Sequence, residues 1–170
     1  SILHSDDFYN DEDVLNNVIN VFVENKLNDI VYGDLIYVKQ NDINNNLRYW
    51  KPGNFKNNSF FKGWHPPHPS FFIKKKIYKQ YGSYELKHGN SSDVELMFRL
   101  LTIHGVQSQY LNKTLVKMRY GGASNRNILS IIKQNLKILK FLKINSNPYK
   151  ILKFFLFKFA DRLKQFVIRK

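Results

Sequence analysis

Apolar residues recur at helical spacing in three segments of the first 105 residues. The period is clearest over residues 12–25, where Asn10 or Asp11 can serve as an N-cap and acidic residues fall in the first turn. Residues 74–82 predict a short helix that ends at a glycine. Residues 92–105 predict a longer helix, with a serine at its start and a glycine at its end.

Short runs rich in β-branched and aromatic residues predict five strands, at residues 29–38, 47–50, 70–73, 106–111 and 114–119. The first run is nearly all apolar, so we expect a buried strand with Gly33 and Asp34 as a bend or bulge inside it. The asparagine-rich stretch 40–46 predicts a turn. Asn112 and Lys113 predict a tight turn between the last two strands.

The order of these elements predicts an α/β fold in which a mixed sheet carries flanking helices. A long connection rich in proline covers residues 51–70, and long loops in compact domains often carry function. The last part of the chain changes composition, because residues 126–143 and 148–169 are lysine-rich, aliphatic and helical in pattern. We therefore expect a sheet-containing part over residues 1–125 and a basic, amphipathic helical tail over residues 126–170.

Charge is distributed very unevenly along the 170 residues. The formal net charge is +14, but residues 1–34 carry −7, residues 35–122 carry +10 and residues 123–170 carry +11. A basic surface attracts nucleic acid, an anionic membrane or a phosphorylated small molecule, and charge alone does not choose among them. The chain has no cysteine, which excludes disulfides and thiolate metal sites.

An acidic cluster stands close to the start of the chain, at His4-Ser5-Asp6-Asp7. Two adjacent carboxylates repel each other, so such a cluster is either a solvated cap ahead of the helix at residues 12–25 or a site. On a strand, His4 and Asp6 would face the same way.

Five short motifs occur in an order that resembles the second half of family 2 glycosyltransferases, which are inverting enzymes of the GT-A fold that build bacterial polysaccharides. The motifs are LHSDDFY (3–9), IVYGD (30–34), GWHPPHPSFFIKK with IYKQYG (63–82), SSDVELMFRLL (91–101) and LVKMRYGGAS (115–124). The resemblance covers residues 1–125. It implies that the chain is the C-terminal part of such an enzyme, that the nucleotide-binding part lies ahead of Ser1, and that the fragment is inactive alone.

The resemblance implies that the acidic cluster holds a divalent cation, Mg²⁺ or Mn²⁺. Asp6 would be the principal ligand, with Asp7 and His4 beside it, and the cation would grip the diphosphate of a nucleotide-diphosphate-sugar donor. Carboxylate oxygens suit these ions, and a cation offsets the charge that develops on the leaving diphosphate. His4 departs from the Asp or Asn that is usual in the family.

The resemblance places the catalytic base at Asp93, at the start of the helix predicted over residues 92–105. An inverting transfer needs one carboxylate to take a proton from the hydroxyl of the acceptor, which would be a saccharide or a lipid-linked molecule. The alternative is that Asp93 only favours the helix dipole, as acids in a first turn do. Val94 follows where the family has an aromatic residue.

Three further residues have two interpretations each. His68 would line the site near the diphosphate or the acceptor, or it is a structural residue of a proline-rich loop. Arg119, with the glycines of residues 119–124, would form a flap over the phosphates or a plain turn. Trp64 would stack on a sugar or belong to the core.

The tail at residues 147–170 predicts a helix in a membrane interface. Its apolar residues form one stripe, with most of its lysines off it: Ile151, Leu152, Phe155, Leu156, Phe159, Leu163, Phe166 and Val167. The alternative is a helix packed on its own domain. We expect a cytoplasmic protein, peripheral at the inner face of the membrane, with an anionic membrane surface as partner.

Two other function classes compete with the glycosyltransferase prediction. A basic nucleic-acid-binding module would explain the net charge and the many aromatic residues, but it leaves the acidic start unexplained, and no nucleic-acid-binding motif is present. We therefore expect no nucleic acid among the partners. A degenerate, non-catalytic GT-A domain would keep the fold and lose the chemistry.

Overall fold

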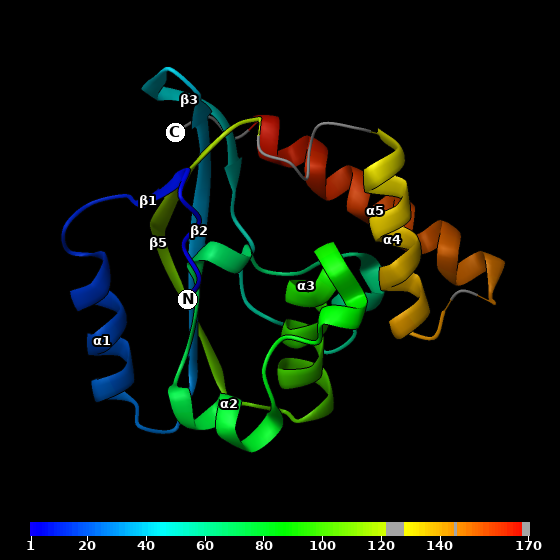
Figure 1. Cartoon of the computed structure of the whole chain (residues 1–170), viewed down its shortest axis with the longest axis horizontal. Coiled ribbons are helices and arrows are strands. Elements are labelled where there is room, and N and C mark those ends of the chain that lie inside the picture. The colour runs from blue at the N-terminus through cyan, green and yellow to red at the C-terminus, as the bar shows by residue number, and fades with distance from the viewer. Residues whose placement is uncertain (122–127, 145, 168–170) are drawn as a thin grey trace.

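The computed structural model describes residues 1–121, 128–144 and 146–167 and has the predicted α/β architecture (Figure 1). Its sheet consists of β1 (Asp7–Tyr9), β2 (Ile30–Lys39), β3 (Asp42–Trp50), β4 (Phe71–Ile73) and β5 (Ser108–Arg119). The strand order is β1-β5-β2-β3, and β4 also pairs with β2. Because β5 runs parallel to β2 and the other pairs are antiparallel, the sheet is mixed.

Helices lie on both sides of this sheet, with α1 on one side and α3, α4 and α5 on the other (Figure 1). The α-helices are α1 (Val14–Glu24), α2 (Lys75–Tyr81), α3 (Ser92–Phe98), α4 (Ile128–Phe141) and α5 (Pro148–Val167). Three short 3₁₀ segments, η1 (Phe60–Lys62), η2 (His68–Ser70) and η3 (Leu86–Ser91), shape the loops. A π-helical turn, η4 (Arg99–Ile103), continues α3.

The helical tail shares a hydrophobic core with the rest of the chain. Leu139 of α4 and Phe154 of α5 are fully buried in one cluster with Tyr32 of β2 and Met97 of α3. Trp64 packs on the same cluster and its Nε1 donates to the carbonyl oxygen of Pro52 at 2.7 Å, which favours the core role for this residue. The tail is therefore integrated with the sheet-containing part.

The prediction of two strands between residues 106 and 119 is wrong, because β5 is continuous there. Its pairing with β2 shifts register between Gly33 and Asp34, so Asn112 and Lys113 form a bulge instead of a turn. An ideal Cβ on Gly33 would lie 2.6 Å from Cγ of Leu115. This close approach favours glycine at position 33, and the extra residues of the bulge lie in β5 instead of in β2, where the sequence predicted a bend or bulge.

The largest differences from the predicted bounds are in β3, α1 and α3. Strand β3 begins at Asp42, so the asparagine run is mostly strand. Helix α1 begins at Val14, and Asp11 Oδ1 accepts from the N–H of Asp13 at 3.1 Å, so the acids precede the helix instead of filling its first turn. Helix α3 ends at Phe98, where the π-helical turn begins.

Candidate active site

Asp93 lies in the first turn of α3, held by hydrogen bonds of its neighbour. The hydroxyl of Ser92 donates to the carbonyl oxygens of Glu85 and Gly89 at 2.8 and 2.7 Å, which ties the helix start to η3. The carboxylate of Asp93 thus emerges from a fixed backbone. Its Oδ1 is buried and has no hydrogen-bond partner among the described residues.

His68 opens the 3₁₀ turn η2, directly before β4. The buried hydroxyl of Ser70 donates to the carbonyl oxygen of Gly33 at 2.8 Å, which fixes this turn against β2. Two prolines, Pro67 and Pro69, restrict the backbone on either side of His68. The proline-rich loop therefore places the imidazole on a rigid support.

Three of the predicted site residues meet in one chain of contacts. His68 Nδ1 lies 3.3 Å from Asp93 Oδ2, and His68 Nε2 lies 3.1 Å from His4 Nε2. These residues come from the loop before β1, from η2 and from α3, so the fold brings together groups that are far apart in sequence. The side chains of His68 and Asp93 are 27% and 23% exposed.

The protonation of His68 follows from its surroundings. Burial lowers the pKa of the His68 ring below its ordinary value, against the opposing effect of Asp93. A neutral ring has one N–H, and the carboxylate at Nδ1 favours the proton there. Nε2 of His68 then accepts from the Nε2–H of His4.

Asp7 differs from its exposed neighbour Asp6 in being buried, at 7% exposure. Neither carboxylate oxygen of Asp7 has a hydrogen-bond partner among the described residues. Burial raises the pKa of Asp7, and His4 partly offsets this. An unpartnered buried carboxylate fits a divalent cation, because the ion would supply the missing partner.

Strand register connects Asp7 with a cavity on the sheet. Asp7 is opposite Met118, Met118 is opposite Tyr37, and Tyr37 is opposite Arg48. Residues directly opposite each other project from the same face of a sheet. Met118, Tyr37 and Arg48 line a cavity of about 300 Å³, so Asp7 belongs to the row that borders it.

The same cavity is lined by His68 and Asp93 and by residues of α4 and α5. The candidate base Asp93 and the row of sheet residues that starts at Asp7 thus border the same cavity. An acceptor bound there would lie beside Asp93, which is the arrangement that proton transfer requires.

The predicted metal ligands do not form a closed cluster. His4 is in contact with His68, and Arg119 Nη1 donates to the backbone carbonyl of Asp6 at 3.2 Å. The Arg119 guanidinium also lies over the ring of Phe8, 5.1 Å from its centroid, so this residue secures the loop before β1. The glycine flap predicted at residues 119–124 extends outside the described residues from position 122.

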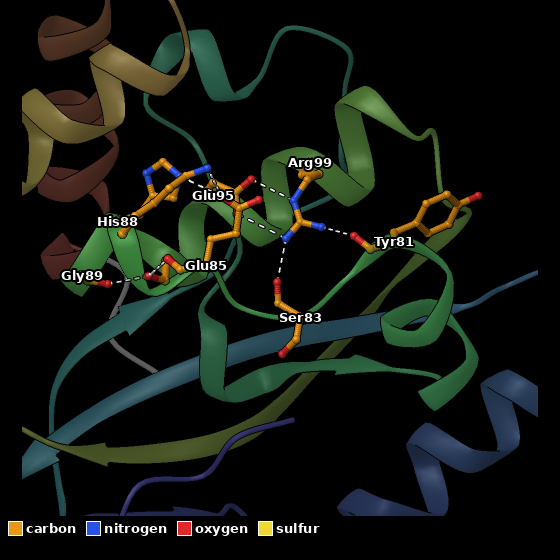
Figure 2. Close-up of polar contacts among 9 residues, drawn as sticks. Tyr81, Ser83, Glu85, His88, Gly89, Glu95 and Arg99 are labelled. Atoms are coloured by element: carbon orange, nitrogen blue, oxygen red, sulfur yellow. Dashed lines mark hydrogen bonds and ion pairs between the residues drawn. The ribbon is translucent and has the colours of Figure 1, made fainter.

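A different group of ligand atoms does cluster, at Glu85, His88 and Glu95. Among the described residues, these three form the group of histidine and acidic side chains that could hold a metal ion, since their ligand atoms all lie within 4.8 Å of one another. Figure 2 shows Glu95 facing Arg99, whose Nε donates to Glu95 Oε1 at 2.8 Å. Lys87 pairs with Glu85. These two cations already offset the carboxylates, so a metal ion here would compete with them.

Arg99 gives this cluster a structural role. Its guanidinium donates to the backbone carbonyls of Tyr81 and Ser83 as well as to Glu95, which joins the end of α2 to α3 (Figure 2). The sequence prediction did not single out this network. The spacing of Glu95 and Arg99, four residues apart on a helix, is the signal that would have found its central ion pair.

Sequence reasoning also missed the cationic residues of the cavity, Arg48, Lys158 and Arg162. Lys158 lies four residues after the buried Phe154, so it falls on the inward face of α5. That spacing was the one feature of the sequence that indicated an inward-facing Lys158.

No protein family model matches the chain, and the search of curated proteins finds no match.

Proposed function

We propose that this chain carries the cation-binding and base-bearing part of an inverting, GT-A-type glycosyltransferase. Its donor is a nucleotide-diphosphate-sugar, and its acceptor is a saccharide or a lipid-linked molecule. The observation that carries the proposal is the contact chain from His4 through His68 to Asp93 at the edge of a cavity. A helix-dipole role alone would leave Asp93 without a reason to face His68.

In this mechanism each residue has a distinct task. The acceptor hydroxyl donates to the carboxylate of Asp93, the hydroxyl oxygen attacks the anomeric carbon of the donor sugar, and the proton passes to the carboxylate as the nucleoside diphosphate leaves. His68 holds this carboxylate in place through its contact with Oδ2. Asp7, with Asp6, would hold Mg²⁺ or Mn²⁺, which offsets charge on the leaving diphosphate.

The test is sugar transfer by a polypeptide that contains this chain, assayed with a panel of nucleotide-diphosphate-sugars and Mn²⁺. The parent should release nucleoside diphosphate, and Asp93→Asn should lower turnover by at least about a hundredfold with donor binding retained. The matched control is Glu85→Gln, which removes a carboxylate outside the cavity. Equal turnover of parent and Asp93→Asn would support the degenerate, non-catalytic alternative.

We also propose that the protein is peripheral at the inner face of the membrane and binds it through α5. No helix within the described ranges is long and apolar enough to cross a membrane. In α5 only Phe154 and Gln165 are buried, while most of the apolar stripe is exposed, including Leu156 at 59% and Phe159 at 65%. An exposed apolar stripe beside lysines suits an anionic membrane interface.

A further inference from the structure

Three cationic side chains converge on the cavity between the sheet and α5. Arg48 comes from β3, and Lys158 and Arg162 come from successive turns of α5. None of the three forms an ion pair with a carboxylate in the described part of the chain. Arg162 makes no hydrogen bond with the described residues either, so no described group occupies its guanidinium donors, and it lines the cavity.

The surrounding structure holds two of these cations in place. Arg48 is 8% exposed, its Nε donates to Gln165 Oε1 at 2.7 Å, and its guanidinium lies 4.6 Å from the centroid of the Tyr37 ring. Lys158 Nζ donates to Asn135 Oδ1 at 2.8 Å. These contacts orient the side chains without neutralising them.

The positive charges of the cavity exceed the negative ones. Burial and, to a smaller extent, the neighbouring charge of Arg162 lower the pKa of Lys158 to about 8, against the opposing effect of Asp93. Burial also lowers the pKa of Arg48. Two carboxylates line the cavity. Asp93 contacts His68, and Asp161 accepts a hydrogen bond from Gln165 Nε2 at 2.9 Å. A bound anion would relieve the repulsion among the three cations.

We propose that this cavity binds a phosphate group, with Arg48, Lys158 and Arg162 as its ligands. Planar guanidinium donors and a lysine ammonium are the side chains that recognise phosphate oxygens. His68 and Asp93 line the same cavity, so the phosphate belongs to the acceptor; this assignment rests on the proposed function, whereas the phosphate site does not.

The lining of the cavity also bears on the source of the phosphate. Phe155 and Phe159 line it and are exposed members of the apolar stripe of α5. The cavity is therefore continuous with the surface proposed to contact lipid. A phosphate attached to a lipid and a water-soluble phosphate share the same recognition chemistry, and they differ in whether the apolar stripe contributes to binding.

The test is calorimetric titration of the chain with inorganic pyrophosphate. Arg162→Gln should weaken binding by about tenfold, the usual scale for one charge-assisted hydrogen bond. Lys164→Gln is the matched control: it removes one charge from the same helix outside the cavity, and it should change binding by less than about twofold. Thermal melts check that both variants fold. No binding by the parent, or equal losses in the two variants, would overturn the proposal.

A second titration, with short-chain phosphatidic acid, distinguishes the two sources. Tighter binding than pyrophosphate, lost in Phe159→Ser, supports a phosphate carried by a lipid; equal binding of both ligands supports a water-soluble phosphate. Neither titration needs a sugar donor. Phosphate binding without sugar transfer would therefore overturn the proposed function alone, and transfer without phosphate binding would overturn this inference alone.

Discussion

Asp6 and Asp7 are adjacent in sequence but stand in different environments. Asp7 is buried without a hydrogen-bond partner among the described residues, whereas Asp6 is exposed and contacts Arg119 through its backbone carbonyl. The sequence predicted Asp6 as the principal cation ligand. Because Asp7 is the buried carboxylate, we now expect Asp7 to contribute more to cation binding than Asp6.

We expect Asp7→Asn to weaken Mn²⁺ binding by at least about tenfold, because the variant removes a buried charged ligand whose oxygens make no hydrogen bond with the described residues. Asp6→Asn should weaken it less. Calorimetric titration of the chain with Mn²⁺ measures both. A larger loss in Asp6→Asn would restore Asp6 as the principal ligand, and unchanged binding in both variants would argue against a cation at this cluster.

His65 should make stability depend on pH. Burial lowers its pKa from 6.5 to about 3, and its ring packs against Trp50 at 5.2 Å between centroids. Between these pH values the unfolded chain binds a proton that the folded chain does not. Stability from this residue is therefore complete above about pH 6.5 and is lost as pH falls towards 3, by up to about 1.4 kcal/mol per pH unit.

Urea unfolding of the parent and of His65→Gln at several pH values measures this effect. The free energy of unfolding of the parent should fall more steeply with decreasing pH than that of the variant, because the slopes of all other groups are common to both. Parallel pH profiles would contradict the burial of a neutral imidazole at this position.

The candidate site was only partly predictable from single residues. Motif order identified Asp93, His68 and His4, yet no local signal indicates that His4 contacts His68 across 64 positions. That contact depends on how β1 and η2 are arranged around the sheet. Lys158 was missed because its sequence neighbours are mostly apolar, and its residue type does not separate it from the exposed lysines of the tail.

At the scale of elements, local period predicted the existence of the helices and of the strand at residues 29–38. It failed at residues 106–119, because Asn112 and Lys113 are typical turn residues while the parallel pairing with β2 keeps the strand continuous. It also missed the π-helical turn after Phe98. Both errors concern features that are decided by non-local packing.

The position of α5 depends on Gly63. This residue has φ +75°, and an ideal Cβ on it would lie 2.7 Å from Cβ of Lys158. Gly53 has a similar φ of +68° with nothing within 4 Å of its ideal Cβ. The two glycines therefore share the same backbone strain on substitution and differ only in the contact with α5.

We expect Gly63→Ala to lower the free energy of unfolding by about 1 to 3 kcal/mol more than Gly53→Ala, because the added methyl displaces α5. Urea unfolding of both variants measures the difference. Equal losses would show that the close approach of residue 63 to α5 contributes nothing to stability.

The exposed stripe of α5 should bind anionic vesicles. In co-sedimentation, the chain should bind vesicles containing anionic lipid in a salt-sensitive manner, and Leu156→Gln with Phe159→Gln should abolish most of this binding. The matched control replaces two exposed leucines elsewhere, Leu27 and Leu86, which are 77% and 89% exposed. Equal binding by the two double variants would rule out α5 as the contact surface.

At the scale of the whole molecule, the α/β class follows from element order. The tail predicted from residue 126 onwards shares its core with the sheet-containing part. Leu139 and Phe154 are buried with residues of β2 and α3, so the tail completes the core. Sequence composition changes at this point because α4 and α5 also carry lysines, most of them exposed. A change of composition does not require a change of folding unit.

Unfolding should therefore be one cooperative transition. Circular dichroism follows all helices, including α4 and α5, whereas fluorescence follows Trp50 and Trp64 in the sheet-containing part. We expect the two probes to give coincident urea transitions, since a shared core links the reported regions. An earlier loss of helix signal would indicate that the tail unfolds as a separate unit.

The contact between Arg48 and Gln165 joins positions that are 117 residues apart. During synthesis on the ribosome all five strands emerge before α5, so Arg48 is synthesised long before its partner Gln165. The wall formed by α5 closes over that arginine only after residues 148–167 have been added. Because Phe154 of the same helix belongs to the core that contains Tyr32 of β2, a ribosome stalled before α5 would hold a chain that lacks both one wall of the cavity and part of its core.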